Sequence, residues 1–505
     1  MIKKLLIIIA NISFILLAFC QAPSIQWQKA LGGSSVDYAN SIQQTSDGGY
    51  IVAGSSFSED GDVVGNQGYY DAWIVKLNSN GTIQWEKSVG GSNYDEAYSI
   101  QQTSDGGYIF AGFFNYLNGS LTDTNYWLVK LDATGGIQWQ KSLGGYFGDY
   151  AFSVQQTSEG GYIVAGYSAS KDGDATTNYG GQDYWIIKLN NNGDIQWQKS
   201  IGGSRDDLAY SIQQTSDGGY IVVGNSYSND GDITGNHGST DFWIVKLTNN
   251  GSIQWQKSLG GSNQDIGRSV YQTSDGGYIV AGASNSKDGD VTGNHGVYDA
   301  WIVKLNSTGI IQWQKSLGGS DYDYAHSIQQ TSDGGYIVAG YSSSKNGDVI
   351  GNHGSADFWI VKLTNNGNIQ WQKSLGGSSS DVAFSIKQTL DGGYIVAGST
   401  NSSNGDVTEF HGSQDYWIVK LANEYLNINE ISDKNIITVE NPVKNKINIQ
   451  SEEKITSLQL YNLDGKLIRS TNNKDMHISD LSKGNYLLSI QLENGKTVSK
   501  KIIKD

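Results

Sequence analysis

Proline and cysteine are almost absent from this sequence. Two prolines stand against 65 glycines, 14 tryptophans and 30 tyrosines, a composition that suits short strands joined by tight turns. The many aromatic residues argue against a disordered, glycine-rich chain. The only cysteine is Cys20, at an expected cleavage site. The mature chain is therefore predicted to contain no thiol, which excludes disulfides and cysteine-based chemistry.

Positive charge is also scarce. The formal net charge is −16 over 505 residues, and the acidic excess lies between residues 21 and 421, because residues 422–505 are nearly balanced. A surface of this charge repels nucleic acid and anionic membranes. Partners of those two classes are not expected, whereas cations and neutral ligands are compatible with it.

The first 20 residues have the pattern of a signal peptide, with two lysines before an apolar segment that ends at Phe19. That segment is too short and too interrupted to predict a membrane span, so no transmembrane segment is expected after cleavage. Ala18-Phe19-Cys20 fits a small-x-small cleavage site, which leaves Gln21 as the new N-terminus. The alternative is a lipid anchor on Cys20, but a lipoprotein signal prefers a small residue where Phe19 stands.

The chain up to residue 421 is a repeat, and each unit contains two tryptophan motifs. Successive Ile-Gln-Trp motifs are 58 residues apart, except for one spacing of 54. These motifs contain Trp27, Trp85, Trp139, Trp197, Trp255, Trp313 and Trp371, and the second motif begins at Trp73, Trp127, Trp185, Trp243, Trp301, Trp359 and Trp417. Self-similarity at such a period is typical of repeat architectures.

Each unit contains four strand-like runs separated by turn signals. In the fifth unit they are Arg268–Thr273, Tyr278–Ala281, Trp301–Leu305 and Ile311–Lys315. Four short antiparallel strands in a unit of this length are typical of a propeller blade. The chain begins with a fourth-strand motif and leaves the repeat after a third-strand motif. This order predicts an all-β protein with a seven-bladed β-propeller, over residues 21–421, that is closed by its N-terminal strand.

The units resemble the SBBP-type β-propeller repeats of bacterial surface and secreted proteins. The matching pattern is Asp-Gly-Gly-Tyr-Ile-Val-Ala-Gly, then Asp-x-Trp-Ile-Val-Lys-Leu, then Asn-Gly-x-Ile-Gln-Trp, and it covers residues 25–421. The resemblance implies the propeller fold but no particular activity, because propellers serve many functions.

After residue 421 the repeat ends. A linker is predicted over 422–436 and a small β-sandwich over 437–505, where short alternating runs are separated by Asp-Gly, Lys-Gly and Asn-Gly turns. In order, this segment contains an Asn-Pro start at Asn441, a Tyr-Asn-x-x-Gly-Lys hairpin from Tyr461, a Leu-Ser-Lys-Gly-x-Tyr strand from Leu481 and a lysine-rich end.

This tail resembles the type A sorting domain of the type IX secretion system of Bacteroidota. The resemblance implies that the secretion machinery recognises the tail and that the protein passes from the periplasm across the outer membrane. It also implies removal of the tail, with release of the protein or its attachment to the cell surface. The alternative is an ordinary accessory β-domain.

Acidic residues recur on the loop-bearing face of the predicted ring. One aspartate follows each Gly-Gly turn, at Asp37, Asp95, Asp149, Asp207, Asp265, Asp323 and Asp381, and another precedes most third strands. Repetition in every blade favours a scaffold role, in which the carboxylate caps a turn by accepting backbone N–H groups. Histidines that repeat in the same loops are predicted to pack or to hydrogen bond there.

The Asp-Gly-Asp loops of the same face have a second interpretation. Their carboxylates, represented by Asp230, Asp232, Asp288 and Asp290, are oxygen ligands of the kind that calcium takes. Calcium is therefore the one cofactor that the sequence suggests, although these loops lack the full spaced ligand set of a recognised calcium loop.

No catalytic motif distinguishes one blade from the others. The sequence has no His-Glu-x-x-His, Gly-x-Ser-x-Gly or phosphate loop, and residues 21–421 contain only the arginines Arg205 and Arg268, too few for a sialidase. The preferred prediction is a non-catalytic interaction module, secreted or on the cell surface. The alternative is a secreted polysaccharide-degrading enzyme, similar to a glycoside hydrolase, that uses acidic loop residues.

The repeat is irregular at the second blade, which is four residues short. A long loop is expected there that has lost the Asp-Gly-Asp element. Together with neighbouring loops it supplies the candidate ligand site, which comprises Tyr69, Tyr70, Tyr94, Phe113, Phe114, Tyr116, Tyr146 and Phe147. Aromatic faces beside carboxylates and amides suit a glycan or a peptide. The alternative is that these side chains only fill the space that the shorter loop leaves.

Overall fold

The computed structural model describes residues 21–118, 121–423, 438–439, 442–451, 453–462, 467–493 and 497–504. Every regular element in these ranges is a β-strand, which confirms the all-β prediction. The chain divides between Glu424 and Tyr425 into two compact units. The predicted signal peptide with Cys20, most of the predicted linker, Asn441 and the tip of the predicted hairpin at 463–466 lie outside the described residues.

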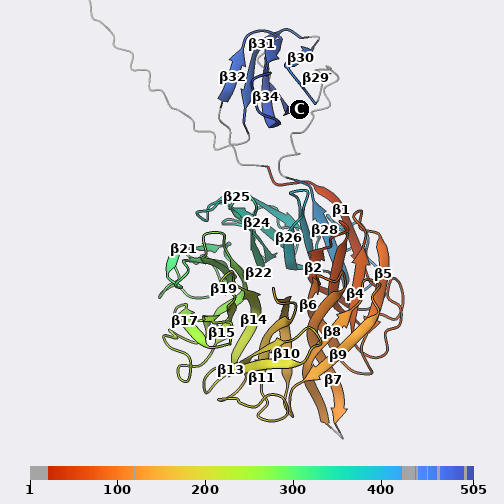
Figure 1. Ribbon diagram of the computed structural model, residues 1–505, viewed down its shortest axis with the longest axis vertical. Helices are drawn as coiled ribbons and strands as arrows, with labels where there is room; N and C mark the ends of the chain where they lie inside the picture. The colour runs from red at the N-terminus through yellow and green to blue at the C-terminus, as the bar shows by residue number, and fades with distance from the viewer. Residues whose placement is uncertain are drawn as a thin grey trace, which may run out of the picture. The chain divides into compact units, whose positions relative to one another are not determined.

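The first unit consists of four-stranded antiparallel sheets, one for each repeat, and their strand arrangement is that of a β-propeller (Figure 1). We call the sheets blades 1 to 7 in chain order. Blade 1 contains β2 (Asp37–Gln44), β3 (Tyr50–Ser56), β4 (Asp71–Leu77) and β5 (Ile83–Val89). Blade 2 contains β6 (Asp95–Gln102), β7 (Tyr108–Asn118), β8 (Leu121–Leu131) and β9 (Ile137–Leu143). Blade 3 contains β10 (Asp149–Gln156), β11 (Tyr162–Ser168), β12 (Asp183–Leu189) and β13 (Ile195–Ile201).

Blades 4 to 7 repeat this order of strands. Blade 4 contains β14 (Asp207–Gln214), β15 (Tyr220–Ser226), β16 (Asp241–Leu247) and β17 (Ile253–Leu259), and blade 5 contains β18 (Asp265–Gln272), β19 (Tyr278–Ser284), β20 (Asp299–Leu305) and β21 (Ile311–Leu317). Blade 6 contains β22 (Asp323–Gln330), β23 (Tyr336–Ser342), β24 (Asp357–Leu363) and β25 (Ile369–Leu375). Blade 7 contains β26 (Asp381–Gln388), β27 (Tyr394–Thr400) and β28 (Asp415–Leu421) with β1 (Ile25–Leu31).

Each blade is built by the same local chemistry. The second and third strands are buried along their whole length, as in β3 and β4, because neighbouring blades cover both of their faces. The turn between the first two strands needs a left-handed residue, which Gly48 supplies in blade 1 with a φ of 83°. Asp47 then accepts the backbone N–H of Gly49 at 2.9 Å and pairs with the buried Lys76 at 2.9 Å.

Side chains of the innermost strands bind each blade to the next. The first strands of successive blades contact one another around the centre of the unit, and the Oγ of Ser41 in blade 1 accepts the backbone N–H of Ile100 in blade 2 at 3.2 Å. The amide oxygen of Gln43 accepts the backbone N–H of Gln102 at 2.7 Å, and that of Gln102 accepts the N–H of Ser46 at 2.8 Å. We call these contacts the inter-blade clasp.

The first and last strands of the unit belong to one sheet. Strand β1 pairs antiparallel with β28, and the indole N–H of Trp417 donates to Gln28 Oε1 at 2.8 Å, as the indole of Trp185 donates to Gln198 within blade 3. The clasp also joins blade 7 to blade 1, because Leu390 N donates to Gln44 Oε1 at 2.8 Å. Strand β1 therefore takes the place of the fourth strand of blade 7.

The second unit contains two antiparallel sheets that share one apolar core, as in a small β-sandwich. The core includes Ile447, Leu460, Met476 and Leu488. One sheet has the order β29-β30-β33 and the other β32-β31-β34-β35. Their bounds are β29 (Thr438–Val439), β30 (Lys446–Gln450), β31 (Ile455–Tyr461), β32 (Leu467–Thr471), β33 (Asp475–His477), β34 (Gly484–Leu492) and β35 (Thr497–Lys504). No helix among the described residues of either unit is long and apolar enough to span a membrane.

Removal of Gln21–Leu31 is expected to lower the melting temperature of the first unit, because blade 7 then loses its outer strand. Each large apolar side chain that is no longer buried accounts for roughly 1.5–3 kcal/mol, and the strand hydrogen bonds are lost in addition. The measurement is thermal unfolding followed by circular dichroism. A synthetic peptide of residues 21–31 should restore the melting temperature when it is added in excess. An unchanged melting temperature of the truncated chain would contradict the role of β1.

Candidate functional site

The repeated aspartates on the loop-bearing face are buried and hydrogen bonded. Asp37 Oδ2 accepts the backbone N–H of Gly33 at 3.0 Å and the hydroxyl of Ser58 at 2.9 Å, and its side chain is fully buried. The backbone N–H of Gln67 donates to Asp71 in the same manner at 3.0 Å. These contacts confirm that the aspartates cap turns.

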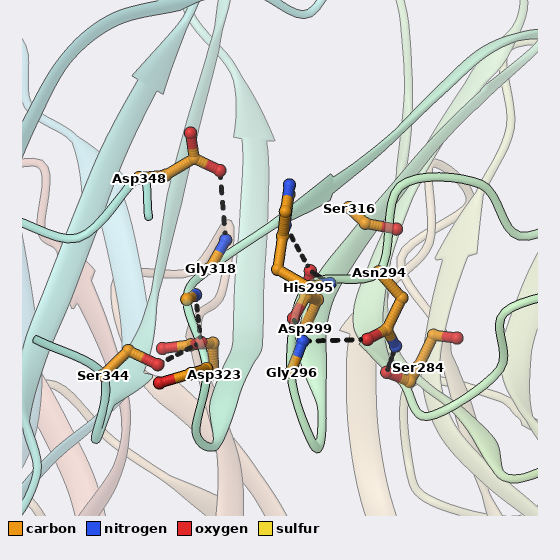
Figure 2. A network of polar contacts seen from close by, with 12 residues as sticks. Ser284, Asn294, His295, Gly296, Asp299, Ser316, Gly318, Asp323, Ser344 and Asp348 are labelled. Carbon is orange, nitrogen blue, oxygen red and sulfur yellow. Dashed lines mark hydrogen bonds and ion pairs between the residues drawn. The ribbon is translucent and has the colours of Figure 1, made fainter. Parts of the chain in front are cut away.

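Figure 2 shows this network at the junction of blades 5 and 6. His295 Nδ1 lies 2.8 Å from Asp299 Oδ2, and Ser344 Oγ donates to Asp323 Oδ2 at 2.8 Å. The same histidine–aspartate contact recurs at His237, His353 and His411. The loop histidines therefore hydrogen bond within their own blades, as the sequence predicted.

The Asp-Gly-Asp carboxylates also accept hydrogen bonds from backbone N–H groups. The N–H donors and their acceptors are Ser204 to Asp230 at 2.8 Å, Gly202 to Asp232 at 3.2 Å, Ser262 to Asp288 at 2.7 Å and Gly260 to Asp290 at 3.3 Å. No group of three or more metal-ligating side chains is present among the described residues. Calcium binding at these loops stays a prediction.

Blade 2 differs from the sequence-based expectation. Residues 113–118 do not form a loop, because β7 and β8 continue as a long hairpin in which Tyr116 is paired with Asp123. Phe113 is buried and packs between Tyr98 and Tyr150 on the inner side. The prediction of a loop is thus wrong for residues 113–118: with the Asp-Gly-Asp turn missing, the two central strands extend instead.

The hairpin leaves a groove beside blade 2. In every other blade one apolar residue of the long loop is buried against the third-strand tryptophan; these residues are Val63, Ala175, Ile233, Val291, Val349 and Val407. Blade 2 has none, and a groove of about 420 Å³ lies between β5 of blade 1 and blade 2. It is lined by Gln67, Lys87, Ser88, Val89, Gly90, Phe114, Trp127, Ile137, Gln140 and Ser142.

The groove is lined by polar groups as well as aromatic rings. In blade 1 the loop carboxylate of Asp62 accepts the backbone N–H of Gly32 at 3.3 Å, whereas the shortened segment of blade 2 offers no such carboxylate to Gly90. Ser88 Oγ is buried with no partner among the described residues, as is the equivalent Ser258 Oγ of blade 4. Gln140 Oε1 accepts the indole N–H of Trp127 at 3.3 Å, and Ser142 Oγ accepts a side-chain N–H of Asn125 at 3.3 Å. The groove therefore combines aromatic faces with amide and hydroxyl groups.

An exposed aromatic stack adjoins this groove. The rings of Tyr69 and Tyr94 lie 5.1 Å apart and only 7° from parallel, and Phe57 and Tyr70 stack on them. The side chains of Tyr69 and Tyr94 are about half exposed. Groove and stack share two loops, because Gln67 precedes Tyr69 and Gly90 precedes Tyr94 by only a few residues.

The structure brings part of the predicted site together. Tyr69, Tyr70 and Tyr94 form the stack, while Phe114 lines the groove and lies 6.4 Å from the ring of Tyr116. Tyr146 and Phe147 are exposed and contact each other edge to face on the next loop. The sequence reasoning missed Phe57, Trp127 and Gln140. The missing apolar loop residue of blade 2 was the signal that could have found Trp127 and Gln140.

Residues 441–505 match the family model of the secretion system C-terminal sorting domain. The chain thus carries a type IX sorting tail, and the protein is exported to the cell surface or secreted. Regulatory protein FlaEY of Caulobacter vibrioides is 23% identical over 237 residues, which are 42% of this chain and 24% of that protein. The match thus spans about a quarter of the length of this curated relative.

Solved structures of low sequence identity are similar to this chain. They include the extracellular domain of a putative hybrid two component system from B. thetaiotaomicron, at 12% identity and a TM-score of 0.42, covering 96% of this chain and 60% of that one. The β-propeller domain of the Trilobed protease from Pyrococcus furiosus is similar at 10% identity and a TM-score of 0.38, covering 78% and 94%. The fold assignment rests on the sheets and their contacts described above.

Burial sets the titration of the capping aspartates. It raises the pKa of Asp71, Asp149, Asp207 and Asp241 to about 6 and that of Asp183 to about 7. On the opposite face burial would also raise the pKa of Asp47, but hydrogen bonds from Thr45, Lys76 and Gly49 outweigh it and lower that pKa to about 2. The capping aspartates and the carboxylates equivalent to Asp47 therefore respond to pH in opposite directions.

Stability is expected to be greatest near about pH 4–5. Between about pH 4 and pH 7 the folded state holds more protons on the capping aspartates than the unfolded state, so stability falls as the pH rises through this window. Below about pH 4 the unfolded state binds more protons on the carboxylates equivalent to Asp47 than the folded state does, so stability also falls as the pH is lowered further. The check is the melting temperature from pH 3 to pH 8; a maximum at or above about pH 7 would contradict the raised pKa values.

Asp183→Asn is the matched test of one such group, because blade 2 has Asn125 at the equivalent position. The amide can still accept the backbone N–H of Tyr179, which donates to Asp183 at 2.5 Å. The melting temperature of the variant is expected to equal or exceed that of the wild type at pH 8, by about 2–4 °C for each kcal/mol gained in the free energy of unfolding. It should also depend less on pH. Asp183→Ala, which removes the acceptor, should be less stable at every pH.

Proposed function

We propose that the protein is a binding module, secreted or displayed on the cell surface, that holds a glycan in the groove between blades 1 and 2. In this proposal residues 21–421 form a closed ring of seven blades, and residues 437–505 form the sorting domain that the secretion machinery recognises. The pairing of β1 with β28 and the clasp between blades 7 and 1 support the closed ring. The signal peptide over residues 1–20 and an origin in Bacteroidota are part of the same proposal.

The groove is the observation that carries the proposal. It is a place where one blade departs from the scaffold that the others share, and its volume of about 420 Å³ lies in the range of small-molecule sites. Its lining offers two aromatic rings, two amides, two hydroxyls and the ammonium group of Lys87. Aromatic rings present a flat apolar face, and amides and hydroxyls can both donate and accept. Sugar rings have surfaces that complement these groups, because their C–H faces are apolar and their hydroxyls lie around the edge.

The aromatic stack extends this surface. Tyr69, Tyr94 and Phe57 form a continuous exposed apolar patch beside the groove, and exposed aromatic patches rimmed by polar groups mark binding sites. A ligand of several sugar units can occupy the groove with one unit and lie along the stack with the next. The predicted peptide ligand remains the other outcome of the experiment below.

Filling the groove is expected to abolish glycan binding. Residues 113–125 are replaced by residues 225–241 of blade 4, which restores the Asp-Gly-Asp loop together with its apolar residue, Ile233. The wild type is screened on an array of neutral oligosaccharides and of peptides, and the dissociation constant of the best ligand is then measured by calorimetry. The graft should weaken binding at least about tenfold, or ~1.4 kcal/mol, with an unchanged or higher melting temperature.

The repeat supplies a matched control at single-residue level. Gln140→Ala changes the groove, whereas Gln314→Ala removes the equivalent glutamine of blade 5, which also hydrogen bonds with Thr292 of the long loop. Each glutamine accepts the indole N–H of its own blade, from Trp127 at 3.3 Å and from Trp301 at 2.7 Å. Only the first substitution should weaken glycan binding. Equal binding by the graft and the wild type, or binding of peptides alone, would refute the glycan site.

Deletion of 441–505 is expected to leave the folded propeller in the periplasm, because the matched sorting domain carries the export signal. The measurement is fractionation of cells that express the full and the truncated chain, followed by detection of the propeller in periplasm, cell surface and medium. Fusion of residues 425–505 to an unrelated periplasmic protein should export that protein. Normal secretion of the truncated chain would contradict the assignment of the tail.

A further inference from the structure

The innermost strands vary at several positions, and at one of them the side chains of successive blades meet around the centre of the propeller. The fourth residue of each of these strands differs between blades although its neighbours repeat; we call this set the axial ring. It comprises Asn40, Tyr98, Phe152, Tyr210, Arg268, His326 and Phe384. Contacts between successive members place them around one axis: Tyr98 and Phe152 stack at 4.5 Å, Phe152 and Tyr210 meet at 5.2 Å, and His326 and Phe384 at 5.2 Å.

Arg268 is the permanent cation of the axial ring. Its guanidinium lies 4.1 Å from the ring centroid of Tyr210, and its Nε is buried without a hydrogen-bond partner among the described residues. None of the ion pairs among the described residues includes Arg268, although its guanidinium also hydrogen bonds to Tyr210. The buried lysines of the third strands differ in this respect, because each has an acidic partner, as Lys362 has Asp333 at 2.8 Å. Arg268 is thus a charge that the protein does not neutralise.

The groups around Arg268 are uncharged at neutral pH. Burial, reinforced by the charge of Arg268, lowers the pKa of His326 to about 3. Burial raises the pKa of Tyr341 to about 12 and also raises that of Tyr324 and Tyr210. The site therefore consists of one guanidinium among phenol rings and a neutral imidazole. Phenol hydroxyls can donate hydrogen bonds to an anion, and aromatic rings can pack against its apolar part.

Among the acidic residues of the innermost strands, Glu96 is the closest in sequence to a member of the axial ring. It is far from Arg268 in the order of the blades. Glu96 belongs to blade 2, three blades from Arg268, and burial raises the pKa of its carboxyl group while Tyr98 hydrogen bonds to it. All members of the axial ring are partly exposed, although Arg268 Nε and His326 Nε2 are themselves buried. A partly buried charge without a counter-charge is costly, and an arginine is best satisfied by a carboxylate or phosphate that takes two parallel hydrogen bonds.

We propose that the axial ring is a second ligand site, in which Arg268 binds the carboxylate of a small organic acid and the surrounding tyrosines hold its body. The site is separate from the groove between blades 1 and 2, which lies at the outer strands. It neither requires the glycan site nor depends on it.

The test is calorimetric titration of the full chain with benzoate and with D-glucuronate, an aromatic and a sugar carboxylate. Benzamide and D-glucose serve as uncharged counterparts. We expect at least one of the acids to bind and its uncharged counterpart not to bind. Arg268→Met should weaken this binding at least about tenfold, since a charge-assisted pair is lost, and Arg268→Lys should lie between the two. The melting temperature of each variant confirms that it folds.

Lys387→Gln is the matched control. Lys387 is another cation of an innermost strand, but it lines a different cavity of about 510 Å³ at the end of these strands, and glutamine is the residue that most blades have there. This variant and the blade 2 graft should both bind the acid as the wild type does. Binding that is equal in Arg268→Met and wild type, equal loss in Lys387→Gln, or binding of neither acid would overturn the proposal. An acid-induced rise of the wild-type melting temperature that is absent in Arg268→Met would support it independently.

Discussion

The inter-blade clasp is the interaction on which the rest of the propeller depends. A serine and a glutamine on each innermost strand, and a second glutamine on five of the seven, can accept backbone N–H groups of adjacent blades, as Ser41 does from Ile100. A backbone N–H that is buried without an acceptor destabilises a fold, so each blade needs a neighbour on both sides. The same requirement explains why β1 completes blade 7, because a sheet of three strands would leave an open edge beside blade 1.

The contacts within and between blades also explain which residue positions are the same in the repeats and which can vary. Tryptophans, capping aspartates and paired lysines each make contacts that the blades require, so these residue types recur, with Asn125 as the exception among the aspartates before the third strand. The fourth residue of the innermost strand makes none of these contacts, and it varies from Asn40 to Phe384. The long loop of blade 2 is free for the same reason, because its loss costs only local packing that Phe114 partly replaces. Function in such a scaffold is best sought where the repeat fails.

Much of this could be read from the sequence because the signals are local. The period of the tryptophans, the Asp-Gly-Gly turns and the order of the strand motifs predicted the all-β repeat, and the aspartate caps followed from their place after a turn. The extended hairpin of blade 2 could not be predicted in this way, since residues 113–118 fit either a loop or a strand until their cross-strand partners are known. The groove was missed because it is defined by an absent residue. The surroundings of Arg268 were missed because a sequence does not show which side chains of separate strands meet at an axis.

The charge of the protein limits what each site can take. The excess of acid over residues 21–421 creates a negative field that repels polyanions, but salt screens this field beyond about 8–10 Å. A small monovalent acid feels the repulsion weakly at a distance and the full charge of Arg268 at contact. A neutral oligosaccharide is not affected by the field at all, so the groove needs no charge to attract it. Both proposed sites are therefore compatible with the acidic excess of residues 21–421.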